Sequence, residues 1–110
     1  MTQNEELIFG LKRWIKKGIN YVGNYSLDEF IHDELRFDAT CFCVEILRNI
    51  LGKIKDSKEL KDKYTATSFD DLYEKFEKLF YKDAIDYQTM YEIFKGEGSI
   101  ILFNLTLNEF

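Results

Sequence analysis

The sequence predicts an all-α fold, an up-and-down bundle of four or five helices in one domain over residues 1–110. Three observations lead to this class. Apolar residues recur every three or four positions along most of the chain, which is the spacing of amphipathic helices. Proline, which helices tolerate least, is absent, and 110 residues allow only one hydrophobic core. Aromatic residues make up 16% of the chain, enough bulky side chains to fill that core.

The first two helices follow from this spacing and from a cap. A helix is expected over residues 7–22, because the apolar pattern ends at Gly23. The segment Ser26-Leu27-Asp28-Glu29 has the form of a capping box, so a second helix is expected from about residue 27 to 56, bent near His32-Asp33. Its core stripe is predicted to contain Leu35, Ala39, Phe42, Cys43, Ile46, Leu47, Ile50, Leu51 and Ile54.

The second half of the chain predicts two further helices and an ambiguous tail. Ser68 is expected to cap a third helix, whose apolar residues continue to Phe80. A fourth helix is expected from Asp86 to a stop at Gly96. Residues 103–107 alternate between apolar and polar, as in a strand, but a lone strand would lack a partner in a helical chain. A short helix over residues 99–109 is therefore preferred, and the strand remains open.

Composition excludes several classes of function. The chain has 15 basic and 20 acidic residues, a net charge of −5, which disfavours broad DNA binding. No apolar run approaches the roughly 18 residues that a membrane span needs. The N-terminal residues MTQNEE are polar and acidic, unlike a signal peptide. A cytoplasmic protein without a membrane segment is expected.

Few residues suggest chemistry. Cys41 and Cys43 are two positions apart, so they cannot bridge within a helix, and no further ligands complete a zinc site. They are interpreted as free, mostly buried thiols. His32 lies four residues after Asp28 and is interpreted as a surface histidine rather than a catalytic or metal-binding one. The glycines form no phosphate-binding motif. No cofactor and no metal ion are expected.

The order of several short motifs carries a family resemblance. Tyr25-Ser26-Leu27-Asp28-Glu29-Phe30 follows the first helix, Glu45-Ile46-Leu47 lies in the long helix, a charged stretch ends in Lys63-Tyr64, and Ile85-Asp86-Tyr87 opens a later helix. Over about residues 5 to 95 this order resembles the HepT-like branch of the HEPN superfamily. The resemblance implies a small all-α fold. It also implies the family's typical role, a ribonuclease toxin paired with a minimal nucleotidyltransferase antitoxin.

The family's catalytic motif, an arginine followed four to six residues later by a histidine, is missing. In the family the histidine can act as general acid or base, and the arginine can neutralise the phosphate. Counting forward from Phe69 places Phe76 and Tyr81 at these two positions, and counting back from Asp86 places Lys75 and Phe80 there. The resemblance therefore implies a HEPN-like domain with a degenerate active site.

The preferred hypothesis is a non-catalytic HEPN-like protein that acts through protein contacts, as a homodimer or with a partner such as a minimal nucleotidyltransferase. The predicted contact surface contains Tyr73, Phe76, Phe80 and Tyr81, because the third helix carries more aromatic residues than one face can bury. Filling the protein's own core is the competing explanation for them.

Two other hypotheses remain open. One is a HEPN-type ribonuclease in which Lys75 stabilises charge and Tyr81 or His32 transfers the proton, although tyrosine titrates too high for a good neutral base. RNA binding is a weaker expectation than protein contact. The other hypothesis is a small acidic adaptor or mobile-element inhibitor that mimics the charge of nucleic acid, which would require carboxylates concentrated on one face.

Overall fold

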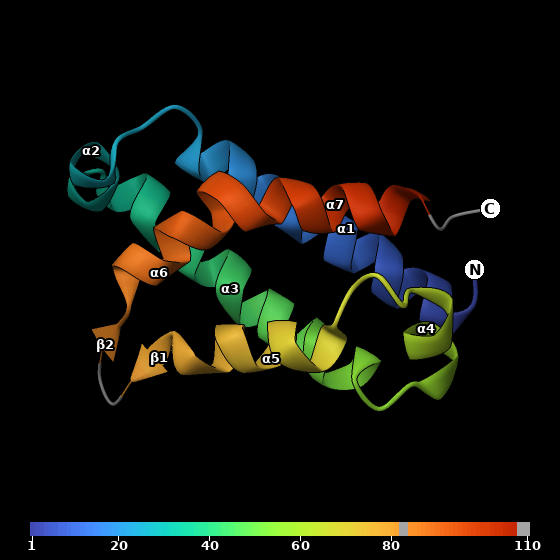
Figure 1. The fold of residues 1–110 in the computed structure, drawn as a ribbon. Helices are drawn as coiled ribbons and strands as arrows, with labels where there is room; N and C mark the ends of the chain where they lie inside the picture. Colours follow the sequence, from blue (N-terminus) through green and yellow to red (C-terminus); the bar gives the residue numbers. More distant parts are fainter. Residues whose placement is uncertain (82–83, 108–110) are drawn as a thin grey trace.

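Helices account for almost all regular structure in residues 1–81 and 84–107, the part of the chain that the computed structural model describes (Figure 1). The predicted all-α bundle is confirmed. The long helical stretches are α1, α3, α5 and the run from α6 to α7, and the short helices α2 and α4 connect them. The elements are α1 Gln3–Val22, α2 Leu27–His32, α3 Glu34–Ile54, α4 Lys58–Lys63, α5 Phe69–Lys78, β1 Phe80–Tyr81, β2 Ala84–Ile85, α6 Tyr87–Glu92, the π-helix η1 Ile93–Glu97 and α7 Gly98–Leu107.

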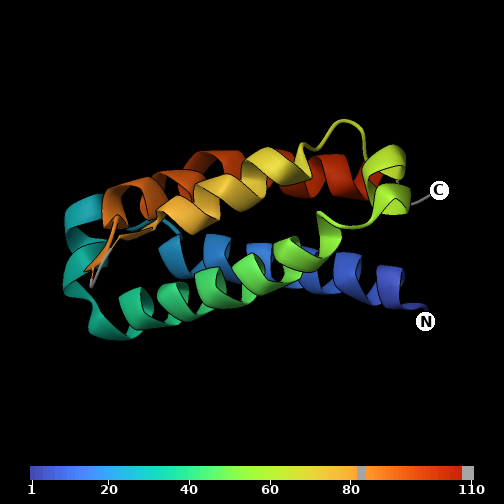
Figure 2. The same ribbon diagram turned by 90° about the horizontal axis from the view of Figure 1, so that it is seen from below.

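The helices form two layers. In Figure 2, α1 and α3 lie side by side and run in opposite directions, and α5 with the run α6–α7 covers one side of this pair. Helix α3 packs against α5, and α1 packs against α7. Each helix of one layer therefore buries its apolar stripe against a helix of the other. Among the described residues, no helix combines the length and apolar character that a membrane span requires.

Polar caps fix where the first helices begin and end. Thr2 accepts a hydrogen bond from the backbone N–H of Glu5 at the start of α1. Gly23 ends α1 with a φ of +50°, a left-handed conformation that favours glycine. The predicted capping box of α2 is present, with reciprocal bonds between Ser26 and Glu29. The backbone N–H of Ser26, followed by its hydroxyl, holds the pKa of the Glu29 carboxyl below its usual value.

The bend predicted near His32-Asp33 is a complete break between α2 and α3, because the Asp33 side chain caps α3 by accepting from the N–H of Arg36. The predicted stripe of α3 is wrong at Leu35 and Phe42, whose exposed fractions are 86% and 59%. Thr40 faces the core instead. Its hydroxyl donates to the carbonyl of Arg36 at 2.7 Å, so a polar residue is satisfied inside the bundle.

Ile46 of α3, also predicted in the core, is only half-buried. The residues of α3 that are buried follow one stripe facing the other layer, namely Thr40, Cys43, Val44, Leu47, Leu51 and Ile54. The stripe is therefore rotated relative to the prediction, away from Phe42 and toward Val44.

Helix α5 ends earlier than predicted. It stops at Lys78, and Phe80 instead begins a short antiparallel pair in which Phe80 lies opposite Ile85. The N–H of Asp86 donates to the carbonyl of Leu79 at 2.7 Å and closes this turn. Ser68 occupies the N-cap position of α5 as predicted, but its side chain makes no capping hydrogen bond.

The helix stop predicted at Gly96 is wrong. The backbone stays helical through the π-helix η1 and continues directly into α7. Gly96 does not adopt a positive φ, so it does not end the helix. The preferred helical tail is confirmed over Gly98–Leu107, while residues 108 and 109 lie outside the described part of the chain.

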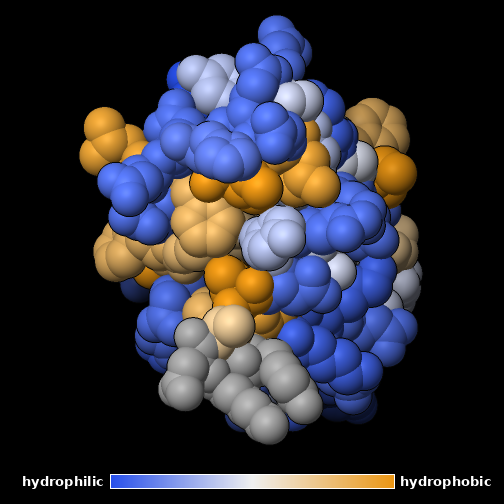
Figure 3. All heavy atoms as spheres, turned by 90° about the vertical axis from the view of Figure 1, so that its left-hand side faces the viewer, coloured by the Kyte–Doolittle hydropathy of each residue, from blue (hydrophilic) through white to orange (hydrophobic). Residues whose placement is uncertain are grey.

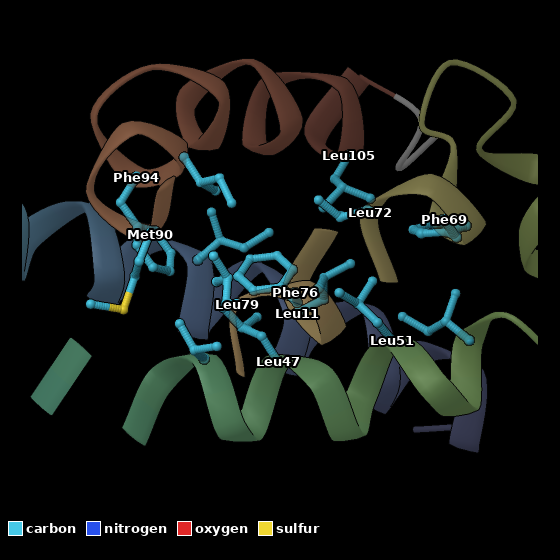
Figure 4. Close-up of a cluster of buried hydrophobic side chains, with 14 of the residues drawn as sticks. Leu11, Leu47, Leu51, Phe69, Leu72, Phe76, Leu79, Met90, Phe94 and Leu105 are labelled. Carbon is cyan, nitrogen blue, oxygen red and sulfur yellow. The ribbon is translucent and has the colours of Figure 1, made fainter. Parts of the chain in front are cut away.

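The core lies between the two layers (Figure 4). Phe76 of α5 is near the centre of the side chains labelled in this view, with Leu47 of α3 below it and Leu105 of α7 above it. The rings of Phe76 and Phe94 pack at a centroid distance of 6.1 Å. Gly18 of α1 allows close contact here, because a methyl group at this position would overlap the ring of Phe94.

Candidate functional site

Of the positions that the resemblance aligns with the catalytic motif, Phe76 and Phe80 are described and apolar. Phe76 has an exposed fraction of 1% and belongs to the core, so its predicted place in a contact surface is wrong. The competing explanation, that this aromatic residue fills the protein's own core, holds for Phe76. Phe80 is partly buried and covered by the guanidinium group of Arg48, 4.4 Å from the ring centroid. The side chain of Tyr81 lies outside the described part of the structure.

Lys75, the proposed substitute for the catalytic arginine, is engaged by a carboxylate. Its Nζ atom lies 2.9 and 3.0 Å from the two carboxylate oxygens of Glu97. Lys75 and Glu97 also line a hollow of about 270 Å³ between the start of α5 and α7, together with Ile100 and Asn104. A lysine paired in this way offers less free positive charge to a phosphate than an unpaired one.

The remaining predicted contact residue, Tyr73, belongs to a polar cluster between α3 and α5. The Tyr73 hydroxyl donates to the Glu77 carboxylate at 2.6 Å. The nearest Nη atoms of Arg48 lie 3.5 Å from Glu45 and 3.7 Å from Glu77. These residues line a hollow of about 410 Å³ that also borders Gly52. The hydrogen bond to Glu77 raises the pKa of Tyr73, which disfavours Tyr73 as a neutral general base.

This cluster joins α3 of one layer to α5 of the other through polar side chains. The Glu45–Arg48 pair follows from its spacing of three residues in the sequence. The Tyr73–Glu77 bond was missed, although its spacing of four within one helix could have indicated it. The Nε atom of Arg48 is buried without a hydrogen-bond partner. The opposing carboxylates keep the Arg48 charge compensated, so the cluster supports a structural role.

His32 is a surface residue, as interpreted from the sequence. Its side chain is 73% exposed, and its Nδ1 atom lies 2.7 Å from the Asp28 carbonyl oxygen and 3.5 Å from the Asp28 carboxylate.

Figure 3 looks onto the end of the molecule near α2, where apolar side chains gather in the middle, bordered by hydrophilic ones. Among the described residues, no group of three or more His, Cys, Asp and Glu side chains is placed to hold a metal ion.

The two cysteines are free thiols held inside the fold. Cys43 is buried and Cys41 is half-buried. Burial raises the pKa of both thiols to about 11, and the Asp38 carboxylate adds to the rise at Cys41. Because the thiolate is the nucleophile, both side chains are unreactive thiols at neutral pH. They do not form a nucleophilic site.

Several large apolar side chains lie on the surface instead of in the core. Phe42 of α3 is 59% exposed, and Phe103 of α7 is 62% exposed. Helix α7 carries no charged residue along its length, and Ile100 on it is 63% exposed. The exposed side of α7 therefore mixes these apolar side chains with the uncharged polar residues Ser99 and Thr106. Exposed aromatic residues were expected on α5, but among the described residues they occur on α1, α3, α6 and α7, as Phe9, Phe42, Tyr87 and Phe103.

Comparisons with protein-family models, with curated proteins and with solved structures gave no match. The resemblance to HEPN proteins therefore rests only on the order of sequence motifs described above.

Proposed function

We propose that the protein is a non-catalytic, HEPN-like helical protein of the cytoplasm that acts through protein contacts. The observation that carries the proposal is the burial of Phe76. Counting forward from Phe69, the arginine position is occupied by Phe76, which is 1% exposed and packs on Phe94. Counting back from Asp86, it is occupied by Lys75, which is paired with Glu97. A catalytic arginine must reach a phosphate and neutralise its charge. A buried phenylalanine can do neither.

The surface supports contact with proteins rather than with nucleic acid. Large apolar side chains such as Phe42 and Phe103 are exposed on helices of a domain whose core is already filled. Exposed apolar side chains of this size are typical of protein interfaces when they gather in patches, and aromatic residues are the favoured anchors in such contacts. The resemblance adds a minimal nucleotidyltransferase to the partners that can be proposed.

The two alternatives receive less support. A substituted ribonuclease would depend on Lys75, which is paired with Glu97 at 2.9 Å. A mimic of nucleic acid would need carboxylates free on one face. Carboxylates of the described residues are instead paired with cations at several places, for example Asp70 with Lys61 at 3.1 Å and Glu77 with Arg48 at 3.7 Å.

Incubation with a structured RNA, without added metal ions, tests the proposal. We expect the purified protein to yield no more cleavage products than a protein-free sample, because Lys75 is paired with Glu97 and the residue five positions after it, Phe80, has no titratable group. The matched variants are Lys75→Ala and Lys78→Ala, two exposed lysines of the same helix. Cleavage by the wild type and by Lys78→Ala that disappears in Lys75→Ala would establish a substituted ribonuclease and refute the proposal.

A further inference from the structure

The outer side of the α1–α3 pair, here called the α1–α3 face, is uncovered in the described part of the chain (Figure 2). The two helices contact each other at successive levels along their length. Ile50 of α3 lies against Gly10 of α1, and the rings of Trp14 and Phe42 meet edge to face at 5.8 Å. Phe42 remains 59% exposed beside Trp14. An aromatic pair therefore lies within a face formed by the two longest helices.

Charged side chains of α1 and α3 lie at three levels along this face. Near the start of α1, Glu6 lies one turn before Gly10, and Lys53 of α3 lies one turn beyond Ile50. In the middle, Arg13 of α1 and Glu45 of α3 lie between the two contacts described above.

The third level follows the aromatic pair. Lys17 lies one turn beyond Trp14, and Asp38 lies one turn before Phe42. At each of the three levels, α1 and α3 therefore carry opposite charges. Of the six side chains, Lys17 is half-buried and the others are exposed.

We propose that the occupant of the α1–α3 face is a second copy of this chain. A two-fold axis parallel to the helices places α1 of one copy over α3 of the other. Because levels along the axis are preserved, Lys17 then meets the partner's Asp38 and Glu6 meets the partner's Lys53. Arg13 lies level with the partner's Glu45, whose carboxylate is also 3.5 Å from Arg48 of its own copy. The Trp14–Phe42 pair packs over the partner's pair. This two-fold arrangement is isologous, since the same patch is used on both copies.

The size of the face also favours this occupant. Helices α1 and α3 have 20 and 21 residues, so each is about 30 Å long. Two such helices side by side give a face of about 600 Å² in projection, close to the roughly 800 Å² of surface that each partner buries in a standard interface. In the run from α6 to α7, the uncharged segment α7 has only 10 residues and offers a smaller apolar surface. The α1–α3 face is therefore the better dimer interface.

This inference rests on the proposed function, since it names the partner in a protein contact, and sedimentation of charge-swapped variants tests it separately. We expect Lys17→Glu and Asp38→Lys each to raise the dissociation constant of the dimer about tenfold or more, because like charges then meet across the interface. The double variant, Lys17→Glu with Asp38→Lys, is expected to restore dimerisation. If the two-fold axis instead ran perpendicular to the helices, Lys17 would meet the partner's Glu6. The double variant would then still place like charges opposite each other, and it would not dimerise.

Circular dichroism checks that each variant is folded. The variants Glu6→Lys, Lys53→Glu and their combination provide a second test of the same design. A wild type that is monomeric at every concentration would overturn the inference, as would single variants that dimerise normally or a folded double variant that stays monomeric. The RNA experiment separates this failure from failure of the proposed function. A monomer without cleavage refutes only the dimer, and a dimer that cleaves RNA through Lys75 refutes only the non-catalytic role.

Discussion

Replacing Phe76 by alanine is expected to lower the free energy of unfolding by about 3–5 kcal/mol, the usual cost of emptying a large buried site. Phe76 is 1% exposed and lies between the two layers, where neighbouring side chains cannot fill the space of a lost ring. Phe42→Ala is the matched control. Because Phe42 is 59% exposed, its loss is expected to cost less than about 1 kcal/mol. Urea denaturation followed by circular dichroism measures both values.

Comparing the two variants tests whether Phe76 lies in the core or on the surface. A large loss for Phe42→Ala would mean that the stripe of α3 predicted from the sequence is the true one. A loss below about 1 kcal/mol for Phe76→Ala would mean that the placement of Phe76 in the core is wrong, and with it the observation that carries the proposed function.

The second large effect is expected at Gly18. Gly18→Ala should destabilise the protein by about 1–3 kcal/mol, the range for overpacking a filled core, because the added methyl group overlaps the ring of Phe94. Gly96→Ala is the matched control, since no atom lies within 4 Å of a methyl group at that position. Both glycines are in helical backbone, where alanine is favoured by about 1 kcal/mol, so the difference between the variants isolates the clash.

Thermal unfolding of the two variants beside the wild type provides the measurement. The expected order of melting temperatures has Gly18→Ala below the wild type and Gly96→Ala equal to it or above it. An unchanged melting temperature for Gly18→Ala would show that Phe94 moves aside easily and that α1 and η1 are not packed as closely as the structure has them.

The parts of the fold that the sequence predicted correctly depend on local chemistry. The capping box at Ser26 and the end of α1 at Gly23 require only neighbouring residues, and both are present. The phase of α3 could not be predicted in this way. It depends on the break at Asp33 and on Thr40, whose hydroxyl is satisfied by its own helix and can therefore face the core.

The helix ends in the second half depended on tertiary context. Gly96 is a common helix stop, but here the chain continues through a π-helix that buries Phe94. Phe80 fits the apolar stripe of α5, yet it lies beyond the helix, opposite Ile85 and under Arg48. Spacing alone cannot distinguish a last helical turn from the first residue of a hairpin.

The candidate site was predicted less well than the fold. The excess of aromatic residues on α5 predicted a contact surface. Phe76 is instead buried in the core, where it packs on Phe94 of η1. The sequence pattern did not reveal this packing. The exposed aromatic residue beside Trp14 is Phe42, which the sequence assigned to the core. The residues available for contact therefore depend on how the layers meet, and that is a property of the whole fold.

Sedimentation of Phe42→Glu beside Phe103→Glu tests most directly the central claim, that the chain makes its protein contact through the α1–α3 face. The two phenylalanines are exposed to 59% and 62% and receive the same substitution on different helices. We expect the wild type and Phe103→Glu to sediment as dimers, and Phe42→Glu to sediment as a folded monomer of 13.1 kDa. A dimer that survives Phe42→Glu but is lost in Phe103→Glu would contradict this account and place the contact on α7.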